Sequence, residues 1–138
     1  MANLKLEIFT PKKQFFSGEV ESLVVEALDG QRGILAGHTP MTVALKAGEL
    51  KLKINGVWKS AYNSDGFIEV RPDEALIFSH GCEWPEDIDE ARTLAEKEKA
   101  EEVLRNTQSL TEHRMAEVAL QRISAMLSIK HNSSIKYD

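Results

Sequence analysis

The sequence predicts a mixed fold, with an N-terminal β-sandwich followed by a C-terminal antiparallel hairpin of two helices. Residues 1–84 hold short segments in which apolar and polar residues alternate, separated by turns that carry glycine or proline. That texture is typical of a sandwich or small barrel. Residues 86–105 hold neither glycine nor proline and are rich in good helix formers. We therefore predict a sandwich domain over residues 1–84 and a helical domain over residues 85–138.

The alternation places the strands. Residues 3–9 and 49–54 carry Leu or Ile at every second position against lysine and glutamate, so each should bury one face. Asn55-Gly56 follows the second segment, and both residues tolerate the positive φ that a type I′ turn requires. We therefore expect a hairpin over residues 49–62. Further strands are expected over residues 19–27, 67–70 and 74–79, with a proline-bearing turn at residues 71–74 between the last two.

The first helix is predicted to begin after Trp84-Pro85. Asp87 is its expected N-cap, and Glu90 three residues later would complete a capping box. The helix should run to Arg105. Its apolar face is narrow, and consists of Ile88, Ala91, Leu94, Ala95, Ala100, Val103 and Leu104.

The second helix is predicted to begin after a break at residues 106–108. Ser109 is its expected N-cap, with Glu112 three residues later. Apolar residues then recur at helical spacing, at Ala116, Ala119, Leu120, Ile123, Met126 and Leu127. The polar segment 131–138 is expected to fray.

The helices are expected to form a marginally docked appendage. Residues 86–105 hold eight carboxylates against four bases, whereas the chain from Ser109 onward holds three against four. The two helices should therefore attract each other, but each exposed pair contributes only about 0.2–0.5 kcal/mol. Alanine-rich contacts bury little apolar area. Such an appendage is able to detach and repack.

Composition excludes several classes of protein. The net charge of −5 argues against nucleic acid, which requires a basic face. No apolar run approaches the roughly 20 residues that span a bilayer, and the N-terminus does not resemble a signal peptide. Cys82 is the single cysteine, so no intrachain disulfide is possible, and we expect it to be a buried apolar side chain in a reducing, cytosolic compartment.

The segment Gly33–Pro40, "GILAGHTP", raises the question of catalysis. A general base at His38 requires an orienting partner, and Asp29 is the nearest acid. Neither His38 nor His80 has a carboxylate or cysteine at ligand spacing, so no metal site is predicted. The segment "DGQRG" lacks the GK[ST] ending of a phosphate loop.

A structural role explains the same segment better. Gly30, Gly33 and Gly37 would supply backbone freedom at turns, and Pro40 would fix an extended stretch. Ile34 and Leu35 are expected to enter the core. A small sandwich enzyme that uses His38 remains an alternative hypothesis.

Several motifs, in order along nearly the whole chain, resemble the epsilon subunit of bacterial F-type ATP synthases. "GQRGILAGHTPM" is similar to the GxxGIxPGHxP segment of that family, and "DGFIEVRPDEALIFS" is similar to its GGFxEVxPxxVxIL segment. "DIDEART" resembles the start of the helical hairpin of that family, and "AEVALQRISAML" resembles its second helix. Two departures are Ala36, where proline is usual, and Asp65, where glycine is usual.

The resemblance implies a non-catalytic rotor subunit in the central stalk of a proton- or sodium-translocating ATP synthase. It would lie at the cytoplasmic face of the bacterial cell membrane as a peripheral protein, with no direct insertion, no nucleic acid partner and no required cofactor. The sandwich would bind the gamma subunit and the c-ring, with His38 toward gamma. The loop facing the ring would consist of Asp29, Gly30, Gln31, Arg32 and Gly33.

The resemblance also implies that the hairpin either lies folded or extends along gamma toward the alpha/beta catalytic head, where it blocks ATP hydrolysis. Arg114, Arg122 and Lys130 are then candidate contacts with an acidic segment of a beta subunit, although a solvated face explains them equally well. A free-standing sandwich binding module whose hairpin dimerises is the alternative function.

Some family members bind ATP on the hairpin, through a motif resembling I/L-D-x-x-R-A and further arginines. Ile88, Asp89, Arg92 and Arg122 match that pattern. The pattern is broken where Thr93 replaces the usual alanine and Met126 replaces an arginine, and methionine offers no fork to phosphate. We expect ATP to be a weak regulatory ligand or not to bind.

Overall fold

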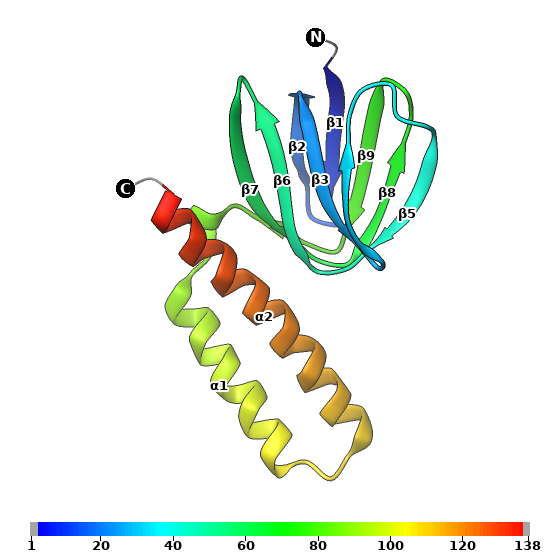
Figure 1. The fold of residues 1–138 in the computed structure, drawn as a ribbon. Helices are drawn as coiled ribbons and strands as arrows, with labels where there is room; N and C mark the ends of the chain where they lie inside the picture. Colours follow the sequence, from blue (N-terminus) through cyan, green and yellow to red (C-terminus); the bar gives the residue numbers. More distant parts are fainter. Residues whose placement is uncertain (1–2, 137–138) are drawn as a thin grey trace. The chain divides into compact units, whose positions relative to one another are not determined.

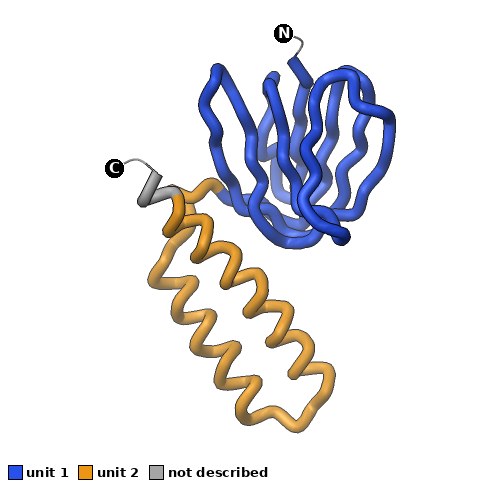
Figure 2. Tube along the Cα trace, in the orientation of Figure 1, with its two compact units in different colours: residues 1–83 blue, residues 84–138 orange. Residues whose placement is uncertain are grey.

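The computed structural model describes residues 3–136, with side chains as far as Asn132. The chain divides into two compact units, residues 1–83 and residues 84–138 (Figure 2). The first unit is built of strands and the second of helices (Figure 1), which confirms the predicted fold class. The boundary between the units falls one residue earlier than the predicted one.

The first unit is a ten-stranded sheet folded into a sandwich (Figure 1). The strands follow the order β10-β7-β6-β3-β5-β8-β9-β1-β2, and β4 pairs with β3 outside this order. Most neighbours are antiparallel, but β1 and β9 are parallel. The strands are β1 (Leu4–Phe9), β2 (Gln14–Val20), β3 (Ser22–Ala27), β4 (Gly30–Ile34), β5 (Met41–Leu45), β6 (Gly48–Ile54), β7 (Val57–Asn63), β8 (Gly66–Val70), β9 (Glu74–Ser79) and β10 (Cys82–Glu83).

The core of the sandwich follows the predicted alternation. Every second residue of β1 points into the core. The same alternation holds in the strands that pair with β1 and in those that face it across the sandwich. Burial of each large aliphatic side chain contributes roughly 1.5–3 kcal/mol. The core residues include Leu4, Leu6, Ile8, Leu23, Leu50, Leu52, Ile68 and Ile77, each at most 1% exposed.

Two predicted turns are confirmed. Asn55 and Gly56 have φ values of 51° and 78°, and they connect β6 to β7 with Ile54 opposite Val57. These are the positive φ values that a type I′ turn needs. The turn between β8 and β9 is closed by a hydrogen bond from the Arg71 amide to the Glu74 carbonyl, at 2.8 Å.

The strand predicted over residues 19–27 is in fact two strands. It breaks at Glu21, whose amide donates to the Lys53 carbonyl at 2.8 Å. The residues before the break belong to β2, which begins at Gln14 and pairs with β1. Because β2 ends the strand order and its inward positions include Gly18, its apolar alternation is weak, and the sequence did not reveal its full length.

The glycine-rich segment has a structural role, with two corrections. Gly30 and Gly37 have φ values of 126° and 84°, which favour glycine. Gly33, however, lies inside β4 and has no positive φ. Ile34 is buried as expected, but Leu35 is 57% exposed, because β4 ends at Ile34 and the next residue turns outward.

The second unit is a helical hairpin consisting of a 3₁₀ turn η1 (Pro85–Asp87) and the helices α1 (Glu90–Asn106) and α2 (Leu110–Lys136). The N-cap of α1 is Asp89 and not Asp87, because Asp87 belongs to the 3₁₀ turn that begins at Pro85. The Asp89 carboxylate accepts from the Arg92 amide at 3.1 Å. The predicted cap at Ser109 is confirmed, since its Oγ accepts from the Glu112 amide at 3.3 Å.

The contact between α1 and α2 consists mainly of small side chains. Thr93 and Ala100 are the buried residues of α1, and they meet a helix whose buried residues include Ala116 and Ile123. Leu94, predicted to lie on the apolar face, is 46% exposed. The helix α2 continues through most of the segment 131–138 that we expected to fray, and residues 137–138 lie outside the described chain.

Substitution of Gly66 by alanine should destabilise the sandwich. A Cβ at this position would clash with the Phe78 carbonyl oxygen, so β8 and β9 would have to separate, at a cost of about 3 kcal/mol. Gly33→Ala is the matched control, because a Cβ there meets nothing within 4 Å. Chemical denaturation would measure both, and equal loss of stability in the two variants would contradict the close approach.

Candidate functional site

The strand register gathers several turns at one edge of the sandwich. Phe9 pairs with Phe78, and Phe78 pairs with Phe67, so β1 and β9 end where β8 begins. Leu45, which pairs with Gly66, ends β5 at the same edge and also pairs with Ala27 at the end of β3. The turn between β3 and β4 therefore protrudes from this edge.

The loop predicted to face a ring forms that turn and most of β4. Leu28 is 69% exposed beside Asp29. The Arg32 Nη2 lies 2.9 Å from the Asp29 Oδ2, and this guanidinium lowers the pKa of the Asp29 carboxyl below its ordinary value. Gln31 donates to the Glu26 carboxylate at 2.9 Å. The turn is thus held in one shape, with an apolar tip.

His38 lies at the opposite edge of the sandwich. The amide of its neighbour Gly37 donates to the Pro72 carbonyl at 2.6 Å, which ties the loop to the turn between β8 and β9. The half-buried imidazole has its Nδ1 2.9 Å from the Thr39 carbonyl oxygen. Asp29, the acid considered as its orienting partner, is bound to Arg32 at the other edge. The arrangement needed for a general base is therefore not assembled.

His80, the second histidine considered as a metal ligand, has a carboxylate neighbour that sequence spacing did not reveal. His80 Nδ1 lies 3.4 Å from Asp65 Oδ2, because the pairing of β8 with β9 brings their ends together. Both side chains are largely exposed. Among the described residues, no three His, Cys, Asp or Glu side chains gather where they could hold a metal ion.

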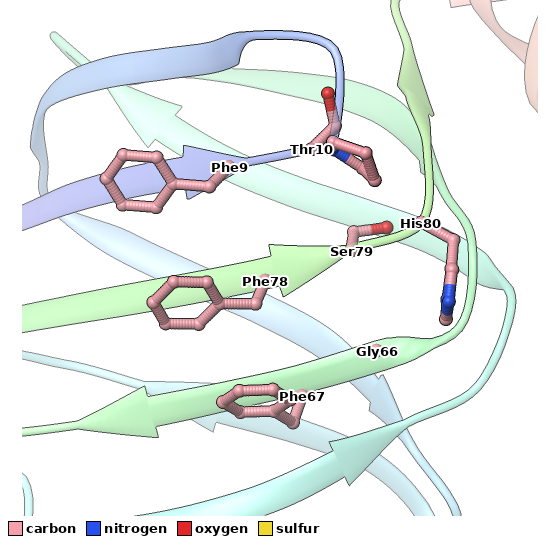
Figure 3. Close-up of a pocket in the computed structure, with 8 residues that line it drawn as sticks. Phe9, Thr10, Gly66, Phe67, Phe78, Ser79 and His80 are labelled. Atoms are coloured by element: carbon pink, nitrogen blue, oxygen red, sulfur yellow. The ribbon is translucent and has the colours of Figure 1, made fainter.

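A row of aromatic side chains on the outer sheet face was missed by the sequence analysis (Figure 3). The Phe9 and Phe78 rings stack at a centroid distance of 5.4 Å, and the Phe78 and Phe67 rings at 5.0 Å. Phe67 is 43% exposed. The three rings, with Thr10, Pro11, Gly66, Ser79 and His80, line an open hollow of about 370 Å³.

The alternation of inward and outward residues along the strands could have predicted this aromatic row. In β1, β8 and β9 the inward phase is set by Ile8, Ile68 and Ile77. Each phenylalanine is adjacent in sequence to one of these isoleucines, and so must point outward. Three aromatic residues at outward positions of neighbouring strands favour a binding surface, because aromatic residues are enriched where proteins meet.

Most of the residues that match the nucleotide motif make contacts within the hairpin itself. Asp89 caps α1, and Arg92 Nε lies 3.4 Å from the Glu96 carboxylate. Thr93 is buried and donates to the Asp89 carbonyl at 2.7 Å. Ile88 is 2% exposed, whereas Arg122 is exposed on α2. Of the four residues that match, Arg92 and Arg122 are thus the cationic ones, and both are exposed.

The three basic residues predicted to contact a catalytic head differ in their surroundings. Arg114 and Arg122 are exposed on α2. Lys130 is half-buried, and its Nζ donates to the Pro85 carbonyl at 3.1 Å. The described helices do not combine the length and the apolar character needed to cross a lipid bilayer.

Two family models match the chain. The first, "ATP synthase, Delta/Epsilon chain, beta-sandwich domain", matches residues 3–85, and the second, "ATP synthase, Delta/Epsilon chain, long alpha-helix domain", matches residues 86–127. The chain is similar to the ATP synthase epsilon chain of Caldanaerobacter subterraneus subsp. tengcongensis, at 47% identity over 125 residues, which cover 90% of this chain and 91% of that one. It is 39% identical to the Bacillus velezensis epsilon chain over 132 residues, covering 96% and 100%.

Solved structures share the fold. A chain in the Euglena gracilis mitochondrial ATP synthase assembly of OSCP, F1 and c-ring superposes with a TM-score of 0.82 at 20% identity, covering 93% of this chain and 81% of that one. A chain in the central stalk and c-ring of the Tetrahymena thermophila mitochondrial ATP synthase gives a TM-score of 0.65 at 12% identity, covering 92% and 96%.

The Cys82 thiol should react slowly with alkylating reagents. Burial raises its pKa to about 11, so on the order of a hundredfold less thiolate is present at pH 8 than for an ordinary cysteine. The raised pKa favours the folded state below the ordinary thiol pKa, and this contribution is lost as the pH rises toward 11. Measurement of the alkylation rate of Cys82 as a function of pH, with the denatured chain as control, would test this prediction. Identical pH profiles in the folded and denatured chains would contradict the raised pKa.

Proposed function

The chain belongs to the delta/epsilon chain family of ATP synthases, and from this membership we propose that it is the epsilon subunit of a bacterial F-type ATP synthase. It is a non-catalytic central-stalk subunit that couples rotation of a proton- or sodium-translocating c-ring to the catalytic head. It is held at the cytoplasmic face of the membrane through the ring. The observation that carries the proposal is that the two family models match in order, over residues 3–85 and 86–127, and so include both units.

The gamma subunit packs on the outer face that bears the aromatic row. Phe67 supplies an exposed ring, and the neighbouring hollow can accept an apolar side chain. Thr42 and Ala44, both exposed on β5, continue this face because they pair with Glu69 and Phe67. His38 lies beyond the far end of β8, so gamma would run along the strand. Partly buried aromatic residues supply much of the binding energy in such contacts.

The c-ring contacts the opposite edge, through the turn between β3 and β4. The exposed Leu28 provides an apolar contact, and the bonded pair of Asp29 and Arg32 keeps the turn in shape without a partner. A preorganised turn loses little conformational freedom on binding. This supports a fixed attachment to the ring.

The hairpin inhibits ATP hydrolysis when it extends toward the alpha/beta head. Leu110, Met115 and Val118 of α2 are 66%, 67% and 49% exposed, and large exposed apolar side chains favour a second contact surface. Arg114 and Arg122 lie on the same helix and can meet acidic residues of the head. ATP is a weak regulatory ligand or does not bind, because Asp89 and Arg92 already have partners within α1.

The same exposed apolar residues favour one alternative, a free-standing binding module that dimerises through its hairpin. Sedimentation of the purified chain separates the two functions, since a stalk subunit should be monomeric alone and bind gamma tightly.

Phe67→Asp should weaken binding to gamma by about 2 kcal/mol or more, roughly thirtyfold, because a charge would replace a central aromatic contact. Trp58→Asp is the matched control: Trp58 is 36% exposed on β7, outside the aromatic row. Calorimetry with purified gamma would measure both affinities. An unchanged affinity for Phe67→Asp, or equal losses in the two variants, would exclude this face.

Deletion of residues 86–138 should raise ATP hydrolysis by the assembled complex while leaving ion pumping coupled to that hydrolysis. The sandwich keeps its contacts with gamma and the ring, and the inhibitory helices are gone. Hydrolysis and pumping would be compared in membranes carrying the full or the shortened chain. Unchanged hydrolysis in the shortened complex would remove the case for inhibition.

A further inference from the structure

The open end of the hairpin is held differently from its closed end. At the closed end, residues 107–109 connect α1 to α2 covalently. At the open end, the C-terminal part of α2 lies beside the η1 turn (Figure 1). Any separation of the two helices must begin at this open end, because the other end is tethered.

A charged hydrogen bond closes the open end. The Lys130 Nζ donates to the Pro85 carbonyl oxygen at 3.1 Å, across 45 residues of sequence. The same carbonyl accepts from the Ile88 amide at 3.2 Å, so the ammonium also braces the 3₁₀ turn. The adjacent residues Ile88 and Ile129 are 2% and 3% exposed. A charged donor in such partly water-excluded surroundings makes a stronger bond than a neutral one.

The rest of the helix contact offers little to replace this bond. Along the middle of the hairpin the buried side chains are Thr93, Ala100, Ala116 and Ile123, and only Ile123 is a large aliphatic one. Less apolar area is therefore buried there than in the sandwich core, and stabilisation scales with that area. At the open end, the bond from Lys130 adds a charged polar contact to the buried Ile88 and Ile129, so its loss should loosen this end.

We propose that Lys130 is a latch that holds the folded hairpin closed by binding the Pro85 carbonyl. Release of the latch frees the η1 linker and the end of α2 in one step. Lys130 cannot contact the catalytic head while it is bound to Pro85, so closing the latch withdraws one of the three basic residues assigned to that contact. The latch belongs to the isolated chain; only this second use of Lys130 rests on the proposed function.

Hydrogen exchange of the purified full-length chain tests the latch. Lys130→Met keeps the aliphatic stem but removes the donor, and it should raise exchange of the Ile88 and Thr93 amides about tenfold, which corresponds to about 1.4 kcal/mol. Lys130→Arg retains a cationic donor and should preserve most of the protection. Arg122→Met is the matched control, because it removes one charge from an exposed position on the same helix.

Unchanged exchange in Lys130→Met, or an equal increase in Arg122→Met, would overturn the latch. Amides of β1 and β9 report whether the sandwich stays folded in each variant. If Lys130→Met lost its helical signal altogether, recovery of protection in Lys130→Arg would support the latch, and loss of protection there would overturn it. The measurement needs no gamma subunit or ring, so its failure is distinguishable from failure of the proposed function.

Discussion

The alternation of large aliphatic residues along the strands is the constraint on which the rest of the structure depends. Leu4, Leu6 and Ile8 are fully buried, and they pack against equally buried leucines and isoleucines of the facing and adjacent strands. Because a strand's side chains have a period of two, a slip of one residue would expose this whole set. The sandwich is therefore fixed in register. The hairpin has a smaller set, with Ile88, Ile123 and Ile129 as its buried large aliphatic side chains, and it depends more on small side chains and polar contacts.

The same constraint determines which surfaces the sandwich presents. Since Ile8, Ile68 and Ile77 must point inward, Phe9, Phe67 and Phe78 must point outward and stack across three strands. The register also sends the turn between β3 and β4 to one edge and the loop of His38 to the other. The buried core thus holds two edges and one outer face in fixed positions, as the proposed coupling role between two partners would require. The hairpin, with its exposed apolar residues, suits a part that changes contacts.

Local signals in the sequence were sufficient where local chemistry decides the structure. Asn55-Gly56 and Ser109 were predicted from the turn and cap that each residue favours, and both predictions hold. Where tertiary contacts decide, the sequence was insufficient. The break at Glu21 depends on pairing with Lys53. The cap at Asp89 is a local feature that the sequence analysis placed two residues too early, because Pro85 begins a 3₁₀ turn before the helix. The aromatic row was visible in principle, but it required the register of three strands that are not adjacent in sequence. The bond from Lys130 to Pro85 spans 45 residues and has no sequence signature at all.

Equilibrium unfolding followed by two probes tests the contrast between the sealed sandwich and the thinly packed hairpin. In a Trp84→Phe variant, Trp58 on β7 is the remaining tryptophan, and its fluorescence reports the sandwich. Far-ultraviolet circular dichroism reports the helices. The helical signal should be lost at a clearly lower denaturant concentration than the fluorescence signal, because units with separate cores open separately. Coincident transitions would contradict it, since they would mean that the hairpin and the sandwich fold as one cooperative body.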